Sequence, residues 1–102
     1  MASKPSSNNG RSVGAPVTAI EATLTERGNR YGDFTDHARI CQELKRTIYG
    51  GPNAFALNDV QRQALDVIAD KIARIVSGDP NYADNWHDIQ GYAKLAEDRL
   101  DN

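Results

Sequence analysis

Apolar residues recur at helical spacing between residues 58 and 78. Asn58 and Gln61 open this stretch with the spacing of a capping box, and Gly78 followed by Asp79-Pro80 ends it. Every third or fourth residue in between is apolar, which is the period of an amphipathic helix rather than of a strand. The apolar stripe of this helix consists of Leu65, Ile68, Ala69, Ile72, Ile75 and Val76.

Two more helices are expected before this one. Thr18 and Glu21 also have the spacing of a capping box, and Gly28 is expected to end the short helix that they begin. Thr35 is a good N-cap for a second helix, which Gly50-Gly51-Pro52 terminates. The apolar stripe expected on the second helix consists of Ile40, Cys41, Leu44 and Ile48.

A fourth helix is expected after Asp79-Pro80, because the residue before a proline disfavours the helical conformation. It begins near Ala83 and carries Asp84 in its first turn, where the helix dipole favours a carboxylate. No stretch alternates with period two long enough for a strand. The sequence therefore predicts an all-α fold, a compact bundle of about four helices. The core stripe expected on the fourth helix is Trp86, Ile89, Ala93, Ala96 and Leu100.

The chain of 102 residues has the length of a single domain. Residues 1–16 are rich in serine, asparagine, glycine and proline and are expected to form a disordered tail, while residues 17–102 are expected to form one helical domain. The tail holds no apolar run long enough for a signal peptide or a membrane span, so a cytoplasmic location is expected. A core this small often recruits a partner subunit, and a homo-oligomer is expected.

Charge and cysteine content exclude several classes of function. The formal net charge is −2, from 12 Lys and Arg against 14 Asp and Glu, so no global field attracts duplex nucleic acid or an acidic membrane. Recognition of a phosphate must therefore be local. The single cysteine, Cys41, excludes an intramolecular disulfide and a cysteine-based zinc site, and its apolar neighbours favour a buried thiol.

The third and fourth helices each carry a second stripe that mixes apolar and charged side chains. A stripe of this kind is unusual for a solvated surface, where the apolar members would gain nothing. It suggests the wall of a cleft or a subunit interface. The two stripes are Val60, Val67, Lys71 and Arg74 on the third helix, and Asp84, Asp88, Gly91 and Leu95 on the fourth.

The cations on this second stripe allow two interpretations. Lys71 and Arg74 lie one turn apart and could hold a phosphate, with the guanidinium as a planar fork and the ammonium as a compact charge. Alternatively, they form structural ion pairs with Asp84 and Asp88 across the short turn. The two roles are compatible, because carboxylates often hold a cationic site in place.

The stretch from Arg27 to Phe34 joins the first two helices and carries further ligand candidates. Arg30 provides a cation, Tyr31 an aromatic face, and Gly32 lets a ligand approach the backbone, all of which suit a nucleotide. The competing interpretation is an ordinary interhelical turn.

Four aspartates offer an alternative metal site. The pairs Asp66 with Asp70 and Asp84 with Asp88 are each spaced by four residues, so each pair lies on one side of its helix. Two facing pairs could hold Mg²⁺ for attack of water on a phosphate. However, Asp66 and Asp70 lie on the side of the helix away from Lys71, so the four are not expected to converge within one chain.

Two motifs carry a family resemblance. The residues from Glu26 to Phe34, Glu-Arg-Gly-x-Arg-Tyr-Gly-Asp-Phe, and those from Lys71 to Ala93 resemble a family of small helical phage and prophage proteins. The Tyr-Gly loop, the Lys-Ile-x-Arg-Ile helix and the Asp-Ile-x-x-Tyr helix, with Asp88 and Tyr92, are also distantly similar to the nucleotide-modification-associated domain of phages. That resemblance implies contact with nucleotides or modified bases.

The helical layout also resembles the all-α nucleoside triphosphate pyrophosphatases of the MazG kind. Their Glu-x-x-Glu helix binds Mg²⁺, and this chain has no Glu-x-x-Glu. Its nearest counterpart is Asp66 with Asp70, at a different spacing.

The sequence is therefore compatible with three functions. The first is a non-enzymatic protein, without a cofactor, that binds a nucleotide, a cyclic nucleotide or another nucleotide-derived signal and, by analogy, sequesters a signal of host defence. The second is a Mg²⁺-dependent nucleotide hydrolase, and the third is an interaction protein whose second stripes serve only as subunit interfaces. The ligand-binding residues expected for the first are Arg30, Tyr31, Lys71, Arg74, Asp84, Asp88 and Tyr92.

Overall fold

The computed structural model describes residues 18–101, and the expected tail at residues 1–16 lies outside them. Four α-helices and one short 3-10 helix follow one another, and residues 18–101 contain no strand. The all-α prediction is therefore confirmed. No helix in this part of the chain is both long enough and apolar enough to cross a membrane. The elements are α1 (Ala19–Tyr31), α2 (Phe34–Tyr49), η1 (Ala54–Ala56), α3 (Asp59–Ser77) and α4 (Ala83–Glu97).

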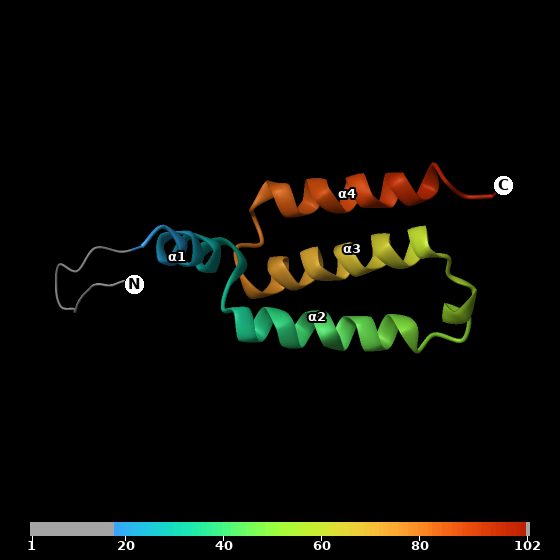
Figure 1. Cartoon of the computed structure of the whole chain (residues 1–102), viewed down its shortest axis with the longest axis horizontal. Helices are drawn as coiled ribbons and strands as arrows, with labels where there is room; N and C mark the ends of the chain where they lie inside the picture. The colour runs from blue at the N-terminus through green and yellow to red at the C-terminus, as the bar shows by residue number, and fades with distance from the viewer. Residues whose placement is uncertain (1–17, 102) are drawn as a thin grey trace.

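The three long helices α2, α3 and α4 lie side by side in one layer, with α3 in the middle (Figure 1). Helix α3 packs against both neighbours, while α2 and α4 make no contact with each other in residues 18–101. Small residues allow this close packing, since Ala69 and Ala73 are fully buried on α3 and Cys41 is buried on α2. Helix α1 extends from one end of the layer and contacts α2 and α3 (Figure 1).

The predicted capping residues of the third helix are confirmed. The Asn58 side chain accepts a hydrogen bond from the Gln61 amide at 2.8 Å, and the Gln61 side chain accepts one from the Asn58 amide at 3.0 Å. The predicted ends at Gly78 and Gly50 are also observed, as is the start of the fourth helix at Ala83.

Two predicted boundaries are wrong. Gly28 does not end the first helix, which continues through Tyr31 and stops at Gly32. A glycine inside a helix costs only about 1 kcal/mol relative to alanine, which the surrounding turns can offset. The second helix begins at Phe34 with Asp33 in the N-cap position, so Thr35 lies inside the helix and is not its cap.

The expected core is the largest correction. On the fourth helix Trp86 is 52% exposed and the buried residue is Asn85 at 1%, while Leu100 lies beyond the end of the helix and is 44% exposed. On the third, Ile75 is buried but Val76 is 62% exposed. A helical wheel tells which residues share a face, but not whether another element covers that face. In one flat layer, each helix contacts its neighbours sideways and leaves a broad face open.

Candidate functional site

Two chain segments cross at one end of the layer, where α1 leads into α2 and α3 leads into α4. The Asp79 amide donates a hydrogen bond to the Arg30 carbonyl at 2.8 Å. A Cβ atom on Gly78 would overlap that same carbonyl, and one on Gly32 would overlap the backbone of Ser77. Gly32 also has a φ of +83°, which side chains rarely permit. We call this crossing of residues 30–33 with residues 77–82 the junction.

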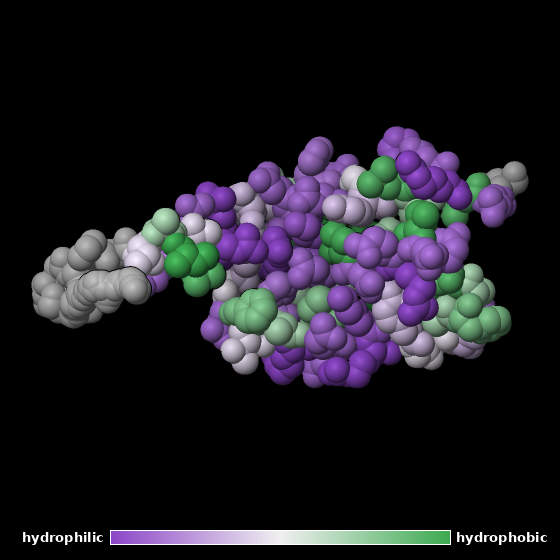
Figure 2. Space-filling view, viewed as in Figure 1, coloured by the Kyte–Doolittle hydropathy of each residue, from purple (hydrophilic) through white to green (hydrophobic). Residues whose placement is uncertain are grey.

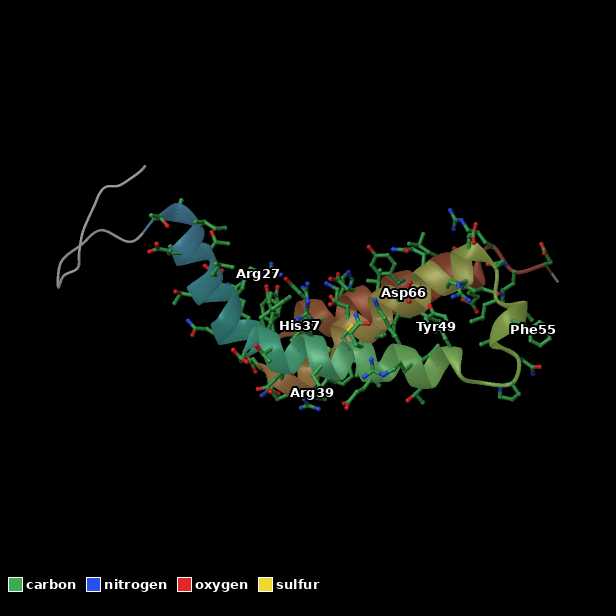
Figure 3. All side chains as sticks on the ribbon, turned by 60° about the horizontal axis from the view of Figure 1, so that its bottom comes forward. Arg27, His37, Arg39, Tyr49, Phe55 and Asp66 are labelled. Carbon is green, nitrogen blue, oxygen red and sulfur yellow. The ribbon has the colours of Figure 1, made fainter. Side chains whose placement is uncertain are left out.

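The junction brings three arginines onto two tyrosines. The guanidinium of Arg74 lies 4.4 Å from the centre of the Tyr31 ring, and that of Arg27 lies 5.0 Å from the same ring. Arg30 lies 4.8 Å from the Tyr82 ring, and the two rings meet edge to face at 6.0 Å. These cation–π distances suit guanidinium groups. Figure 3 shows Arg27 at this end of the layer. We call these five residues the arginine–tyrosine cluster.

A chain of hydrogen bonds links the cluster to the fourth helix. Arg30 donates to the Tyr82 hydroxyl at 2.9 Å, and that hydroxyl donates to the Asp84 carboxylate at 2.9 Å. The hydrogen bond to Asp84 raises the pKa of Tyr82, because it favours the protonated hydroxyl. Arg30 also forms an ion pair with Glu26 at 3.2 Å, although its side chain remains 45% exposed. Asp84 therefore joins the site through Tyr82 and not through a cation.

The predicted ion pairing with the fourth helix is confirmed for Lys71, whereas Arg74 pairs with a different aspartate. Lys71 contacts Asp88 across the seam between α3 and α4 at 2.9 Å, and the hydrogen bond from Lys71 lowers the pKa of Asp88. Arg74 instead pairs with Asp70 one turn earlier on its own helix, at 3.0 Å between Nε and the carboxylate. Asp70 also accepts the imidazole of the buried His37 at 2.8 Å.

Several polar groups near the junction have no hydrogen-bond partner in residues 18–101. The Ser77 hydroxyl and the Asn85 amide nitrogen are buried without one. Arg74 Nε is at ion-pair distance from Asp70 but lacks the direction of a hydrogen bond. Because native structures pair nearly all buried polar atoms, the junction holds unused donors.

Both helices that begin at the junction lack a side-chain cap. Asp33 precedes α2 and Tyr82 precedes α4, and neither side chain accepts a hydrogen bond from the first turn. The free amides and the positive dipole end of an uncapped helix favour an anion. The carboxylates of Asp33 and Asp84 already place some negative charge near these two helix starts.

Tyr92 lies away from the cluster. It lines an open groove of about 370 Å³ between the start of α3 and the end of α4. Figure 2 shows hydrophobic areas between these helices on a face that is otherwise mainly hydrophilic. The expected site is therefore split along the seam, with charged residues at the junction and apolar ones at the far end. The groove is lined by Asp59, Val60, Gln63, Ala64, Tyr92, Leu95, Ala96 and Arg99.

The four aspartates of the alternative metal site do not converge in one copy, as expected. Asp66 accepts a hydrogen bond from the Tyr49 hydroxyl, while Asp70, Asp84 and Asp88 contact the residues given above. Within residues 18–101 no three side chains of the metal-binding types come close enough to hold an ion.

Residues 17–100 match a family model described as a domain of unknown function, DUF6378. The chain belongs to this family. The matched region includes all four α-helices and every residue of the arginine–tyrosine cluster. No curated protein and no solved structure matches the chain.

Sequence reasoning missed two members of the cluster as site residues. Arg27 was visible as a cation beside Gly28, but only the unbroken α1 places it one turn before Tyr31. Tyr82 stands in the Gly-Asp-Pro-x-Tyr segment, 51 residues after Tyr31, and no periodicity connects positions so far apart. The sequence features that could have indicated this contact are Gly32 and Gly78, which permit the two backbones to cross.

Proposed function

We propose that this protein binds a nucleotide or a nucleotide-derived signal at the arginine–tyrosine cluster, without hydrolysing it. One observation carries the proposal: three guanidinium groups and two tyrosine rings gather where two helices begin without side-chain caps. Guanidinium groups recognise phosphate oxygens in pairs, and uncapped helix starts add amide donors.

Exposure distinguishes the roles of the cations. All three cations form ion pairs, but the Arg30 side chain is 45% exposed and can reach a phosphate, whereas those of Lys71 and Arg74 are only 14% and 17% exposed. Arg30 and Arg27 therefore contact the phosphates. Arg74 supports the Tyr31 ring from the protein side.

The base stacks on a tyrosine. Arg27 is the more distant of the two guanidiniums on the Tyr31 ring, and it lies on the exposed surface of α1. When Arg27 turns to a phosphate, it leaves one ring face to the base, an exchange of one cation–π contact for base stacking worth about 1–3 kcal/mol. Asp84 and Asp88 hold Tyr82 and Lys71 in position.

Binding without hydrolysis is the better-supported alternative, because each of the four aspartates already contacts a tyrosine, a histidine or a cation. The resemblance of the two motifs to phage proteins adds a biological setting. In a phage, such binding would sequester a nucleotide signal of host defence.

Isothermal titration against linear and cyclic nucleotides tests this function. The double variant Arg27→Ala with Arg30→Ala should weaken binding by tenfold or more, because charge-assisted hydrogen bonds contribute roughly 1.5–3 kcal/mol each. Lys71→Ala with Arg74→Ala removes the ion pair with Asp88 and the support of the Tyr31 ring but no phosphate contact, so it should weaken binding less than the Arg27 and Arg30 variant does, with helical content unchanged by circular dichroism.

The matched control is Arg39→Ala, which removes an exposed arginine of α2 that pairs only with Glu43 on its own helix. It should bind as the wild type does. The proposal fails when the wild type binds none of the nucleotides, or when Arg39→Ala weakens binding as much as the cluster variants.

A further inference from the structure

The apolar stripes of the three long helices fall on the same side of the layer. On α3, Asp70 and Arg74 share the side that bears the arginine–tyrosine cluster. At about 100° per residue, Leu65, Ile72 and Val76 lie on the opposite side of that helix. We call this side the apolar face.

The flanking helices extend the apolar face. On α4, Asp88 turns toward the cluster side to reach Lys71, which leaves Trp86 on the other side. On α2, Tyr49 turns toward Asp66, which leaves Ile40 toward the other side, where it also packs against the buried Cys41 and Ala69. The apolar face is thus defined by Ile40, Leu65, Ile72, Val76 and Trp86.

These residues are only partly covered. Val76 is 62% exposed, Trp86 52% and Ile72 37%. The α3 positions on this face carry no charge. The cluster side of the same helices differs, because hydrophilic residues dominate it (Figure 2).

The buried core of one copy is small. The buried apolar residues in positions 18–101 are Cys41, Ala64, Ala69, Ala73 and Ile75, and Ile40, Leu44 and Ile48 pack half-buried against them. Ordering each residue costs about 1–2 kcal/mol of backbone entropy, and a layer with one apolar face normally buries it against a second layer. Covering the apolar face would therefore add burial that a single layer lacks.

We propose that a second copy of this chain covers it, the two apolar faces packing together about a two-fold axis. Three helices spaced 8–10 Å apart and roughly 25 Å long present about 600 Å² per copy. Two such faces bury about 1,200 Å², the lower limit for a stable interface. A second copy is present wherever the chain is synthesised. In a two-fold dimer the same surface is used by both copies, so the two apolar faces can bury each other.

This arrangement leaves the arginine–tyrosine cluster on the outside of each copy. The dimer is therefore independent of the proposed nucleotide binding, and either can fail without the other. It also leaves the groove beside Val60 and Leu95 open, since both residues lie on the cluster side of the seam.

Light scattering and sedimentation test the interface. The wild-type chain of 11.2 kDa should have twice that mass at micromolar concentration. Val76→Glu should halve the measured mass or weaken self-association by at least tenfold. Val60→Glu is the matched control, since Val60 is 41% exposed on the same helix but on the cluster side, and it should remain a dimer.

Chemical cross-linking tests the same interface without depending on whether Val76→Glu folds. Single cysteines replace Leu65, Ile72 or Val76 in a Cys41→Ser background, and a short bis-maleimide is added to the folded protein. At least one of them should give a product of twice the mass on a denaturing gel, and Val60→Cys should not. A wild type that is monomeric with full helical content, or a dimer lost in Val60→Glu and kept in Val76→Glu, overturns the proposal.

Discussion

The two ends of the helical layer begin their helices differently. At the end with the α2–α3 connection, α3 starts with reciprocal side-chain caps from Asn58 and Gln61. At the junction, α2 and α4 start after Asp33 and Tyr82 with no side-chain cap at all. One end satisfies its own amide donors, and the other leaves them beside a cluster of arginines. The comparison separates the part of the chain that stabilises the fold from the part suited to a ligand.

The glycines at the two ends of the layer differ in how closely other atoms approach them. Gly32 and Gly78 allow two backbones to cross at the junction, where added Cβ atoms would overlap backbone atoms. At the opposite end, a Cβ atom on Gly51 would lie 3.4 Å from the Ile48 carbonyl, an ordinary contact. The glycines look alike in sequence, but a side chain at Gly32 or Gly78 would overlap backbone atoms, whereas one at Gly51 would not.

The largest expected effect is that of Gly78→Ala. Its methyl group would overlap the Arg30 carbonyl, and neither backbone can move without breaking the bond from Asp79 to Arg30. We expect a loss of about 3 kcal/mol in the free energy of unfolding. Urea denaturation at fixed protein concentration measures it, because self-association would make stability depend on concentration.

Gly51→Ala is the control at the opposite end and should change the free energy of unfolding by less than about 0.5 kcal/mol. Equal losses in the two variants would mean that the junction is no more tightly packed than the loop. The distinction between the two ends would then be wrong.

Local sequence signals predicted most of the helix boundaries and little of the site. Capping and helix-ending residues act within four positions, so Asn58 and Gly78 were found correctly. The end of the first helix was wrongly predicted at Gly28, because a glycine can end a helix or lie inside one. The crossing of the two backbones at Gly32 determines where this helix ends. Contacts across the junction, such as Tyr31 with Tyr82, depend on how two distant turns meet.

The second expected effect is at the capped end. Asn58→Ala removes the acceptor for the Gln61 amide and should lower the free energy of unfolding by about 1 kcal/mol. Asn53→Ala is a matched control on the same connection, because the Asn53 side chain makes no cap hydrogen bond before η1. Urea denaturation of both variants compares them. A loss at Asn53 as large as that at Asn58 would show that capping is not what distinguishes this end.

The third effect has the opposite sign. Gly28→Ala lies inside α1, where an added Cβ meets nothing within 4 Å, so the variant should gain roughly 0.5–1 kcal/mol from higher helix propensity. The gain should appear as a higher urea midpoint. Gly32→Ala, four residues later, should be destabilised instead, because its φ of +83° and its contact with Ser77 exclude a side chain. A destabilised Gly28→Ala would contradict the continuous helix.

The smallest effect is the pH dependence of the ion pair between Lys71 and Asp88, which crosses the seam between α3 and α4, away from both ends. Since the pKa of Asp88 is lowered below its ordinary 3.8 by the hydrogen bond from Lys71, the pair stabilises the folded state above that pH. The contribution disappears as the pH falls through the folded-state pKa. Asp88→Asn should therefore be less stable than the wild type at neutral pH and equally stable in stronger acid, as measured by urea unfolding across a pH series. Lys71→Met should give the same profile, and a difference between wild type and Asp88→Asn that persists below the folded-state pKa would assign the effect to packing rather than to charge.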